Sequence, residues 1–263
     1  MWNVIRAQIY QLLRDKLAWG GFLISMVMSV VLSIFYADEY TSGSEYVAGM
    51  GMMTCMMGMI AVLIFVASVT GVDFTDKTLN YEILSGHTRA QVFFGRWIVA
   101  ELAGIFACMT VMLAPVIVIT FTKGWGDAMD LEGVVLRYSL VIVTLVSIVS
   151  QLVFVTIVTK NMYVTFLVGF VFGYAQAMLG MVVEMIPELT PVVESPMLSV
   201  NHCCTNLLNF EEWTTFFLNE KDQIVYNSAV SSELVIMTIA TAVIGTIILV
   251  LLSYTYFKND DLS

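Results

Sequence analysis

The sequence predicts an all-α, polytopic membrane protein of six transmembrane helices, with both termini cytoplasmic and residues 1–263 forming a single transmembrane domain. Composition is the first reason. Apolar residues make up 59% of the 263 positions, charged residues only 12%, and the mean hydropathy is +0.87. A water-soluble core of this size would leave much of that apolar surface exposed. Long apolar stretches and an uneven division of basic residues give the other two reasons.

Six stretches of about 20 mostly apolar residues are long enough to cross a hydrocarbon core of roughly 30 Å. They are Leu17–Tyr36, Tyr46–Val72, Trp97–Thr122, Val134–Thr159, Met162–Glu184 and Glu233–Phe257. Because no water is present there to pair with backbone amides and carbonyls, each stretch is expected to be helical.

Residues 1–16 precede the first span and are expected to form an interfacial amphipathic helix. Apolar residues recur there at helical spacing on one arc, and polar residues lie elsewhere. The apolar positions are Trp2, Ile5, Ile9, Leu12 and Leu13. Such a helix lies flat in the headgroup layer of the inner leaflet. A frayed tail with chance periodicity is the alternative.

The basic residues orient the bundle. A cytoplasmic N-terminus places Arg6, Arg14, Lys16, Lys77, Arg89, Arg96, Lys160 and Lys258 inside, and Lys123, Arg137 and Lys221 outside. This division follows the positive-inside bias. The net charge of −10 comes mostly from carboxylates in or beside the external loops, so nucleic acid is not expected as a partner.

Small residues recur every fourth position in two spans, which lets two helix backbones approach closely in lipid. The stripes are Gly21, Ser25, Ser29 and Ser33 in the first span, and Thr165, Gly169, Gly173 and Ala177 in the fifth. They favour a subunit interface or a pathway, although contacts within one monomer remain open.

The second span carries methionines at Met50, Met52, Met53, Met56, Met57 and Met59. Core or lipid-facing packing is favoured for these over an adaptable substrate wall.

Residues 73–96 form the predicted cytoplasmic loop between the second and third spans. Thr78–Leu84 can form two helical turns that Gly86 would end, and Thr88 with Gln91 reads as a capping box for the next helix. The loop is therefore expected to be a short, rigid elbow. It either transmits force to a soluble partner or is an ordinary interfacial loop.

Residues 185–232 form a large external loop between spans five and six. Its carboxylates include Glu211, Glu212, Glu220 and Asp222, and aromatic residues lie beside them. An acidic, partly apolar loop that folds into amphipathic helices could receive a cationic amphipathic peptide. Retention of basic residues inside the cell explains the same acidity without a substrate.

The residue pattern predicts neither a set of catalytic residues nor a metal site. His87 and His202 fall on opposite predicted sides, and no GxxxxGK[ST] sequence occurs. Cys203 and Cys204 are expected to react with a membrane-impermeant thiol reagent from outside. Glu101 is the carboxylate well inside a span, with no opposite charge at comparable depth, so ion-coupled transport is not expected.

The polar run and the C-terminal end together resemble the pattern of ABC-2 type exporter permeases. The matching positions are Asp73-Phe74, Thr78-Leu79-Asn80, Leu84-Ser85-Gly86, Arg89, Gly95-Arg96 and Phe257-Lys258-Asn259-Asp260-Asp261-Leu262. Within that family, the chain looks most like short permeases for immunity or resistance to lantibiotic or bacitracin-type peptide antibiotics. Two positions depart from the pattern, because Lys77 replaces a glycine and Arg96 replaces a lysine.

The resemblance implies a permease subunit of the bacterial plasma membrane that exports an amphipathic peptide or a hydrophobic drug. It implies a second permease copy or a related permease as partner, besides membrane lipid, and two ABC ATPase subunits. ATP and Mg²⁺ would bind to those ATPases and no cofactor to this chain. The implied coupling residues are Thr78, Leu79, Asn80, Ile83, Leu84, Ser85, Gly86 and Arg89. The alternatives are a non-transporting membrane sensor or accessory subunit and, with less support, a membrane enzyme.

Overall fold

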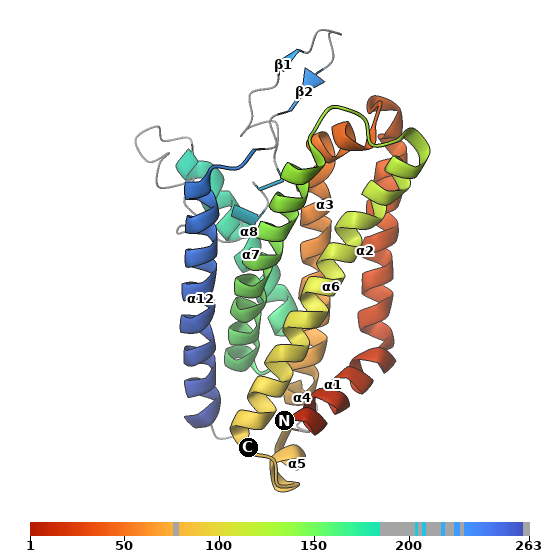
Figure 1. Ribbon diagram of the computed structural model, residues 1–263. Helices are drawn as coiled ribbons and strands as arrows, with labels where there is room; N and C mark the ends of the chain where they lie inside the picture. Colours follow the sequence, from red (N-terminus) through yellow and green to blue (C-terminus); the bar gives the residue numbers. More distant parts are fainter. Residues whose placement is uncertain are drawn as a thin grey trace.

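The computed structural model describes residues 1–75, 79–184, 203–204, 207–208, 217–218, 224–226 and 229–259. In this part of the chain, long helices run side by side along one axis (Figure 1). They are α2 (Lys16–Phe35), α3 (Gly43–Val66), α6 (Arg89–Lys123), α7 (Leu131–Thr159), α8 (Met162–Glu184) and α12 (Ser232–Asn259). The predicted helical architecture is therefore confirmed.

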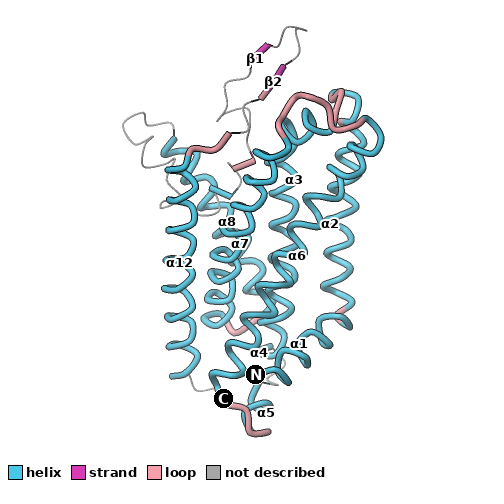
Figure 2. Tube along the Cα trace, viewed as in Figure 1, coloured by secondary structure: helices cyan, strands magenta, loops and turns pink. Residues whose placement is uncertain are grey.

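Shorter elements and loops lie at the two ends of the bundle (Figure 2). They are α1 (Trp2–Arg14), a 3₁₀ turn (Ala37–Glu39), a π-helical turn (Ala67–Gly71), α4 (Val72–Thr75), α5 (Leu79–Leu84), β1 (Phe217–Leu218) and β2 (Ile224–Val225). We call the end that carries α1, α4 and α5 the elbow end. The opposite end, with the α2–α3 and α6–α7 loops, is the far end.

Five segments are long and apolar enough to cross a membrane, which supports a multi-pass membrane protein. They are Lys16–Phe35, Gly43–Thr75, Arg89–Lys123, Leu131–Thr159 and Ser232–Asn259. The predicted fifth span coincides with α8 as a helix, and its passage through the membrane stays a prediction. The α6 helix begins well before the predicted span at Trp97, because the cap at Thr88 starts it outside the apolar stretch.

Side-chain caps explain where several helices begin. The Asp15 carboxylate accepts from the backbone amides of Leu17 and Ala18, which separates α1 from α2. The Ser42 hydroxyl accepts from Glu45 N at the start of α3. The predicted capping box is confirmed, since the side chains of Thr88 and Gln91 bond each other's backbone amides. These caps satisfy amides that have no partner inside a helix.

Small residues in α3 and α6 let these two helices and α7 pack closely at the centre. A Cβ at Gly58 would lie 2.7 Å from the Cys108 sulfur, and one at Gly104 would lie 2.8 Å from Val149. The α12 helix packs against α7 and leaves much of its apolar surface outward. That surface suits a lipid environment and needs no protein partner.

The small residues of the α2 stripe pack inside the chain, which is the alternative that the sequence leaves open. Ser25, Ser29 and Ser33 are buried within the chain. The Ser29 hydroxyl donates to the Val111 carbonyl of α6 at 3.2 Å, and a Cβ at Gly21 would lie 2.7 Å from Ile64 of α3. The small residues thus allow α2 to approach its own neighbours, which closes this face to a second subunit.

The α8 stripe also faces inward. A Cβ at Gly169 would lie 2.8 Å from the side chains of both Leu63 and Leu152, and Thr165 is buried. Gly173 lines a cavity described below, and the Ala177 side chain lies outside the described residues. Where it is described, this stripe therefore packs against α3 and α7 or lines the cavity, and its role at a subunit interface stays a prediction.

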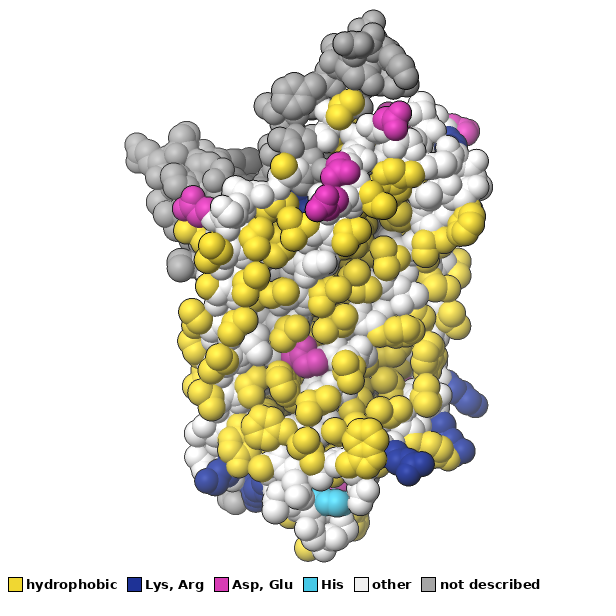
Figure 3. Space-filling view, viewed as in Figure 1, with side chains coloured by type: hydrophobic (Ala, Val, Ile, Leu, Met, Phe, Trp, Pro, Cys, Tyr) yellow, Lys and Arg dark blue, Asp and Glu magenta, His cyan; other side chains and the backbone are white. Residues whose placement is uncertain are grey.

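The charges divide between the two ends. On the face in Figure 3, a hydrophobic belt covers the middle, basic side chains gather at the elbow end and acidic ones at the far end. This distribution agrees with the division expected from the sequence, and it makes the elbow end the cytoplasmic side if the positive-inside bias holds.

At the far end, residues 203–204 and 207–208, which we call the far-end segment, are buried in the mouth of the bundle. Arg137 of α7 donates to the Leu207 carbonyl at 3.1 Å and the Ala229 carbonyl at 3.3 Å. Within the described part of the predicted external loop, β1 and β2 form an antiparallel pair. The amphipathic helices expected for this loop stay a prediction, because most of it lies outside the described residues. Glu211, Glu212, Glu220 and Asp222 lie outside the described residues.

The expectation that Cys203 and Cys204 react readily from outside is wrong. Both are buried, and the Cys204 sulfur lies 3.9 Å from that of Cys55 in α3. Burial raises the pKa of the Cys203 thiol to about 12, and the contact with Cys55 raises that of Cys204 well above its usual value. The reactive thiolate is therefore scarce at neutral pH.

Candidate functional site: an elbow and a central cavity

The α5 helix and the turn after it form the elbow. The helix stops where predicted, because Gly86 adopts φ +98°, a conformation that side chains with a Cβ rarely take. The amide of Gly86 donates to the Ile83 carbonyl and the Ser85 hydroxyl donates to the Glu82 carbonyl. Thr88 then begins α6. The elbow is thus a tight turn between two helices, and hydrogen bonds between residues close in the sequence hold it.

A charged cluster joins the elbow to three neighbouring elements. Arg96 of α6 forms ion pairs with Asp73 of α4 at 2.8 Å and with Glu82 of α5 at 3.0 Å. Gln8 of α1 donates to Asp73 at 3.2 Å and to Glu82 at 3.4 Å. We call these four residues the Arg96 cluster. It connects α1, α4, α5 and α6 through side chains alone.

The ion pair between Arg96 and Asp73 is buried. Arg96 and Asp73 are only 5% and 6% exposed. A buried charge is costly unless it is paired, so each partner of this pair depends on the other. The elbow therefore has a fixed position relative to α1 and α6.

The outer surface of the elbow is apolar. Tyr81 is 71% exposed and Leu84 is 81% exposed, whereas Ile83 packs against the core. Ile83 and Leu84 thus lie on different sides of α5. Leu79 and Asn80 lie in α5, but their side chains, like all of Thr78, are outside the described residues. Exposed large apolar side chains on a rigid corner are typical of a protein contact surface.

Arg89 does not belong to this surface. Its guanidinium donates to the carbonyls of Phe257 at 3.3 Å and Lys258 at 2.9 Å, at the C-terminal end of α12. A cation there satisfies carbonyls that have no partner within the helix and complements the helix dipole. Arg89 therefore ties α6 to α12, and its expected coupling role stays a prediction.

The segment that precedes the elbow contacts the start of α8. The π-helical turn Ala67–Gly71 lies between α3 and α4, and a Cβ at Gly71 would lie 2.8 Å from the Met162 backbone. The Met162 amide donates to the Thr75 hydroxyl at 3.0 Å. Single π turns within α-helices occur often at functional sites. A displacement of α4 would therefore reach α8 through backbone contacts.

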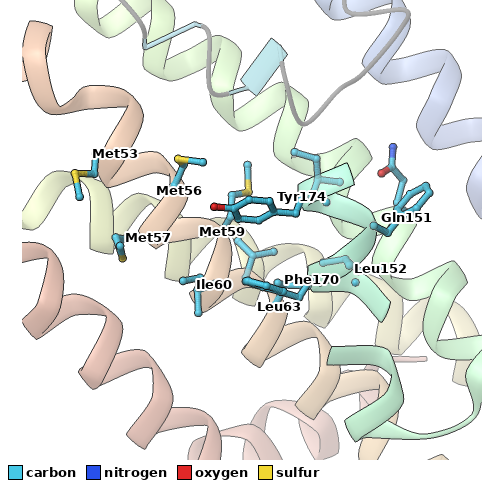
Figure 4. A pocket seen from close by; sticks show the side chains of 15 residues that line it. Met53, Met56, Met57, Met59, Ile60, Leu63, Gln151, Leu152, Phe170 and Tyr174 are labelled. Carbon is cyan, nitrogen blue, oxygen red and sulfur yellow. The ribbon is translucent and has the colours of Figure 1, made fainter. Parts of the chain in front are cut away.

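A cavity of about 410 Å³ lies between α3, α7 and α8. We call it the central cavity. Figure 4 shows methionines of α3 along one side, with the Tyr174 hydroxyl of α8 reaching toward Met56 and Met59. The lining residues are Met53, Met56, Met57, Met59, Ile60, Val62, Leu63, Ile148, Gln151, Leu152, Gly169, Phe170, Phe172, Gly173 and Tyr174. Sequence reasoning favoured packing for these methionines and missed the cavity, which only the arrangement of three helices creates.

Glu101 lies within α6, away from the elbow. The Ser150 hydroxyl of α7 donates to its carboxylate at 2.8 Å, and the Trp97 indole donates to Ser150 at 3.0 Å. No local sequence pattern indicates this series of hydrogen bonds, because its members come from two helices. It ties α6 to α7 at the depth of the membrane-spanning segments.

A scan against protein-family models found no match to this chain, and a search of curated proteins found none either.

Proposed function

We propose that this chain is the membrane-spanning permease subunit of an ATP-driven ABC exporter of the bacterial plasma membrane. The observation that carries the proposal is the elbow, a rigid corner with Tyr81 and Leu84 exposed and the Arg96 cluster behind it. A soluble ATPase could dock there and move the bundle. The resemblance of the motif residues to ABC-2 permeases supports the same function.

The connections of the elbow support a route for such movement. Force on α5 reaches α6 through Arg96 and Glu82, and it reaches α8 through Thr75 and Met162. The α8 helix lines the central cavity, so movement of the elbow would change the shape of that cavity. ATP and Mg²⁺ would act in two partner ATPase subunits, and the exported compound would be an amphipathic peptide or a hydrophobic drug.

A second permease copy or a related permease would complete the exporter. The stripe on α2 is closed to such a partner, because its residues are buried within the chain. The outward apolar faces of the bundle, those of α8 and α12 among them, are open to this contact and to lipid.

The test is association with an ATP-binding protein in the native host. A tagged chain should co-purify with a protein that hydrolyses ATP, and Leu84→Asp should abolish the association, because a charge would replace an exposed apolar anchor. Losing one such anchor can cost about 2 kcal/mol, or roughly a 30-fold weaker complex.

The matched control is Leu131→Asp, since Leu131 is also an exposed leucine but lies at the far end, at the start of α7. Both variants should insert and fold normally. Absence of an ATP-hydrolysing partner from the wild-type preparation would refute the proposed function. Equal retention of the partner by both variants would refute the elbow as its docking site.

A further inference from the structure

The central cavity has the dimensions and lining of a small-molecule site. Its volume of about 410 Å³ falls within the roughly 300–1,000 Å³ that such pockets occupy. It is built by side chains from three separate helices, so it is a product of the tertiary fold and not a groove along one helix.

The lining determines what can bind. Every described residue that lines the cavity is uncharged, and the lining is rich in methionine and aromatic side chains. Methionine is flexible and polarisable, so such walls adapt to apolar ligands of different shape. A ligand with a net charge would have no counter-ion there and would lose its hydration. The Gln151 amide and the Tyr174 hydroxyl offer hydrogen bonds to one neutral polar group.

The position of the cavity indicates how a ligand arrives. Met59 lies near the middle of the Gly43–Thr75 segment, and Gly173 lies near the middle of α8. Met53, Phe170 and Tyr174 are exposed at the edge of the cavity, so it opens sideways between α3 and α8. In a membrane, that opening meets hydrocarbon and not water.

We infer that the central cavity binds a neutral, lipophilic small molecule that enters from the bilayer. Binding itself does not depend on the proposed export, but identification of this molecule as the exported substrate rests on it. The ligand inferred for the cavity therefore differs from the cationic peptide expected at the external loop. A cationic peptide would have to leave its charges outside the cavity.

The test is binding of N-phenyl-1-naphthylamine, a neutral fluorescent probe, to the purified chain in phospholipid nanodiscs, with empty nanodiscs as background. A saturable component at about one probe per chain is expected above simple partition into lipid. Because phospholipid is in large excess, saturable binding also shows that the cavity prefers the small molecule to an acyl chain.

Met59→Trp should weaken the saturable component at least tenfold, because the larger side chain fills the cavity. The matched control is Met109→Trp, since Met109 is also half-buried, lies in α6 and is not among the lining residues. Met109→Trp should bind the probe as the wild type does. Thermal unfolding of both variants checks that each is folded.

Two results would overturn the inference. The first is a probe signal that rises without saturation, together with phospholipid that stays bound to the protein in native mass spectrometry. That result would assign the cavity to an acyl chain of a lipid. Equal loss of binding in both variants, with both folded, would place the probe elsewhere. Since no ATPase is present in this experiment, saturable binding can succeed even where the proposed exporter function fails.

Discussion

The elbow and the loops of the far end are held by different kinds of contact. At the elbow end, the Arg96 cluster joins side chain to side chain, with Arg96 between Asp73 and Glu82. At the far end, basic side chains donate to backbone carbonyls, as Lys123 does to Ala37 and Tyr40. A side-chain ion pair depends on the identity of both residues, whereas a contact with a carbonyl depends only on the path of the backbone.

This difference also explains two exceptions to the charge division. Lys123 and Arg137 are basic residues on the predicted external side, where basic residues are disfavoured. Both hold far-end backbone in place, through the α2–α3 loop and the far-end segment respectively. These hydrogen bonds explain why two basic residues lie on the predicted external side.

Loss of the Arg96 charge should have the largest effect. Arg96→Met leaves the buried Asp73 carboxylate without its cation, and breaking a buried pair from one side costs about 3–5 kcal/mol. Thermal unfolding of the purified chain should show a marked loss of stability. Arg6→Met, at an exposed position in α1, should change stability by no more than about 0.5 kcal/mol.

A triple variant that combines Arg96→Met with Asp73→Asn and Glu82→Gln sharpens this prediction. It removes the two carboxylates that Arg96→Met leaves without a cation. The triple variant should recover part of the lost stability. If Arg96→Met unfolds at the same temperature as Arg6→Met, the elbow does not depend on its ion pairs.

Loss of the Arg137 charge should loosen the far end and leave the elbow intact. Arg137→Gln gives up hydrogen bonds from a charged donor to the Leu207 and Ala229 carbonyls, each worth about 1.5–3 kcal/mol. The far-end segment should open more often, so iodoacetamide should label Cys203 and Cys204 at least about tenfold faster. Lys123→Gln is the control, since it releases a different loop. Unchanged labelling in Arg137→Gln would mean that apolar burial alone holds the segment.

The pH dependence of labelling gives a smaller, independent measure of the same segment. Because the pKa of the Cys203 thiol is raised to about 12, its thiolate fraction in the folded chain should keep rising with pH beyond pH 10. An exposed thiol, with a pKa near 8.5, is almost fully ionised by about pH 10, so its labelling rate levels off there. A plateau at that lower pH in the wild-type chain would show that the segment is already open.

The sequence predicts more of the elbow end than of the far end, for a physical reason. The capping box and the glycine stop are set by residues three or four positions apart, so local patterns reveal them. The Arg96 cluster brings Gln8 to Asp73 across 65 positions, and only the position of each residue in the bundle creates it. The cysteine contact at the far end spans 149 positions, beyond the reach of any local pattern.

The small-residue stripes show a second limit of sequence reasoning. The pattern in α2 correctly indicates close helix packing, but it does not identify the partner, which proves to be α3 and α6 of the same chain. The methionines of α3 show the converse. Their spacing suggests ordinary packing, and α7 and α8 complete the cavity beside them.

The smallest expected effect tests whether backbone conformation, besides charge, sets the elbow. Gly86 and Gly20 both have open space where a Cβ would stand, but only Gly86 has a positive φ. Gly86→Ala should therefore destabilise the elbow by about 1 kcal/mol through backbone strain alone. Gly20→Ala, within α2, should be neutral or stabilise the chain by about 0.5–1 kcal/mol, because alanine loses less entropy in a helix. Gly86→Asn should fall between wild type and Gly86→Ala, since asparagine tolerates positive φ better. Hydrogen exchange of the amides of Ser85 and His87 measures the effect. Exchange that is equally slow in the wild type, Gly86→Ala and Gly86→Asn would show that the Arg96 cluster holds the turn whichever residue stands at position 86.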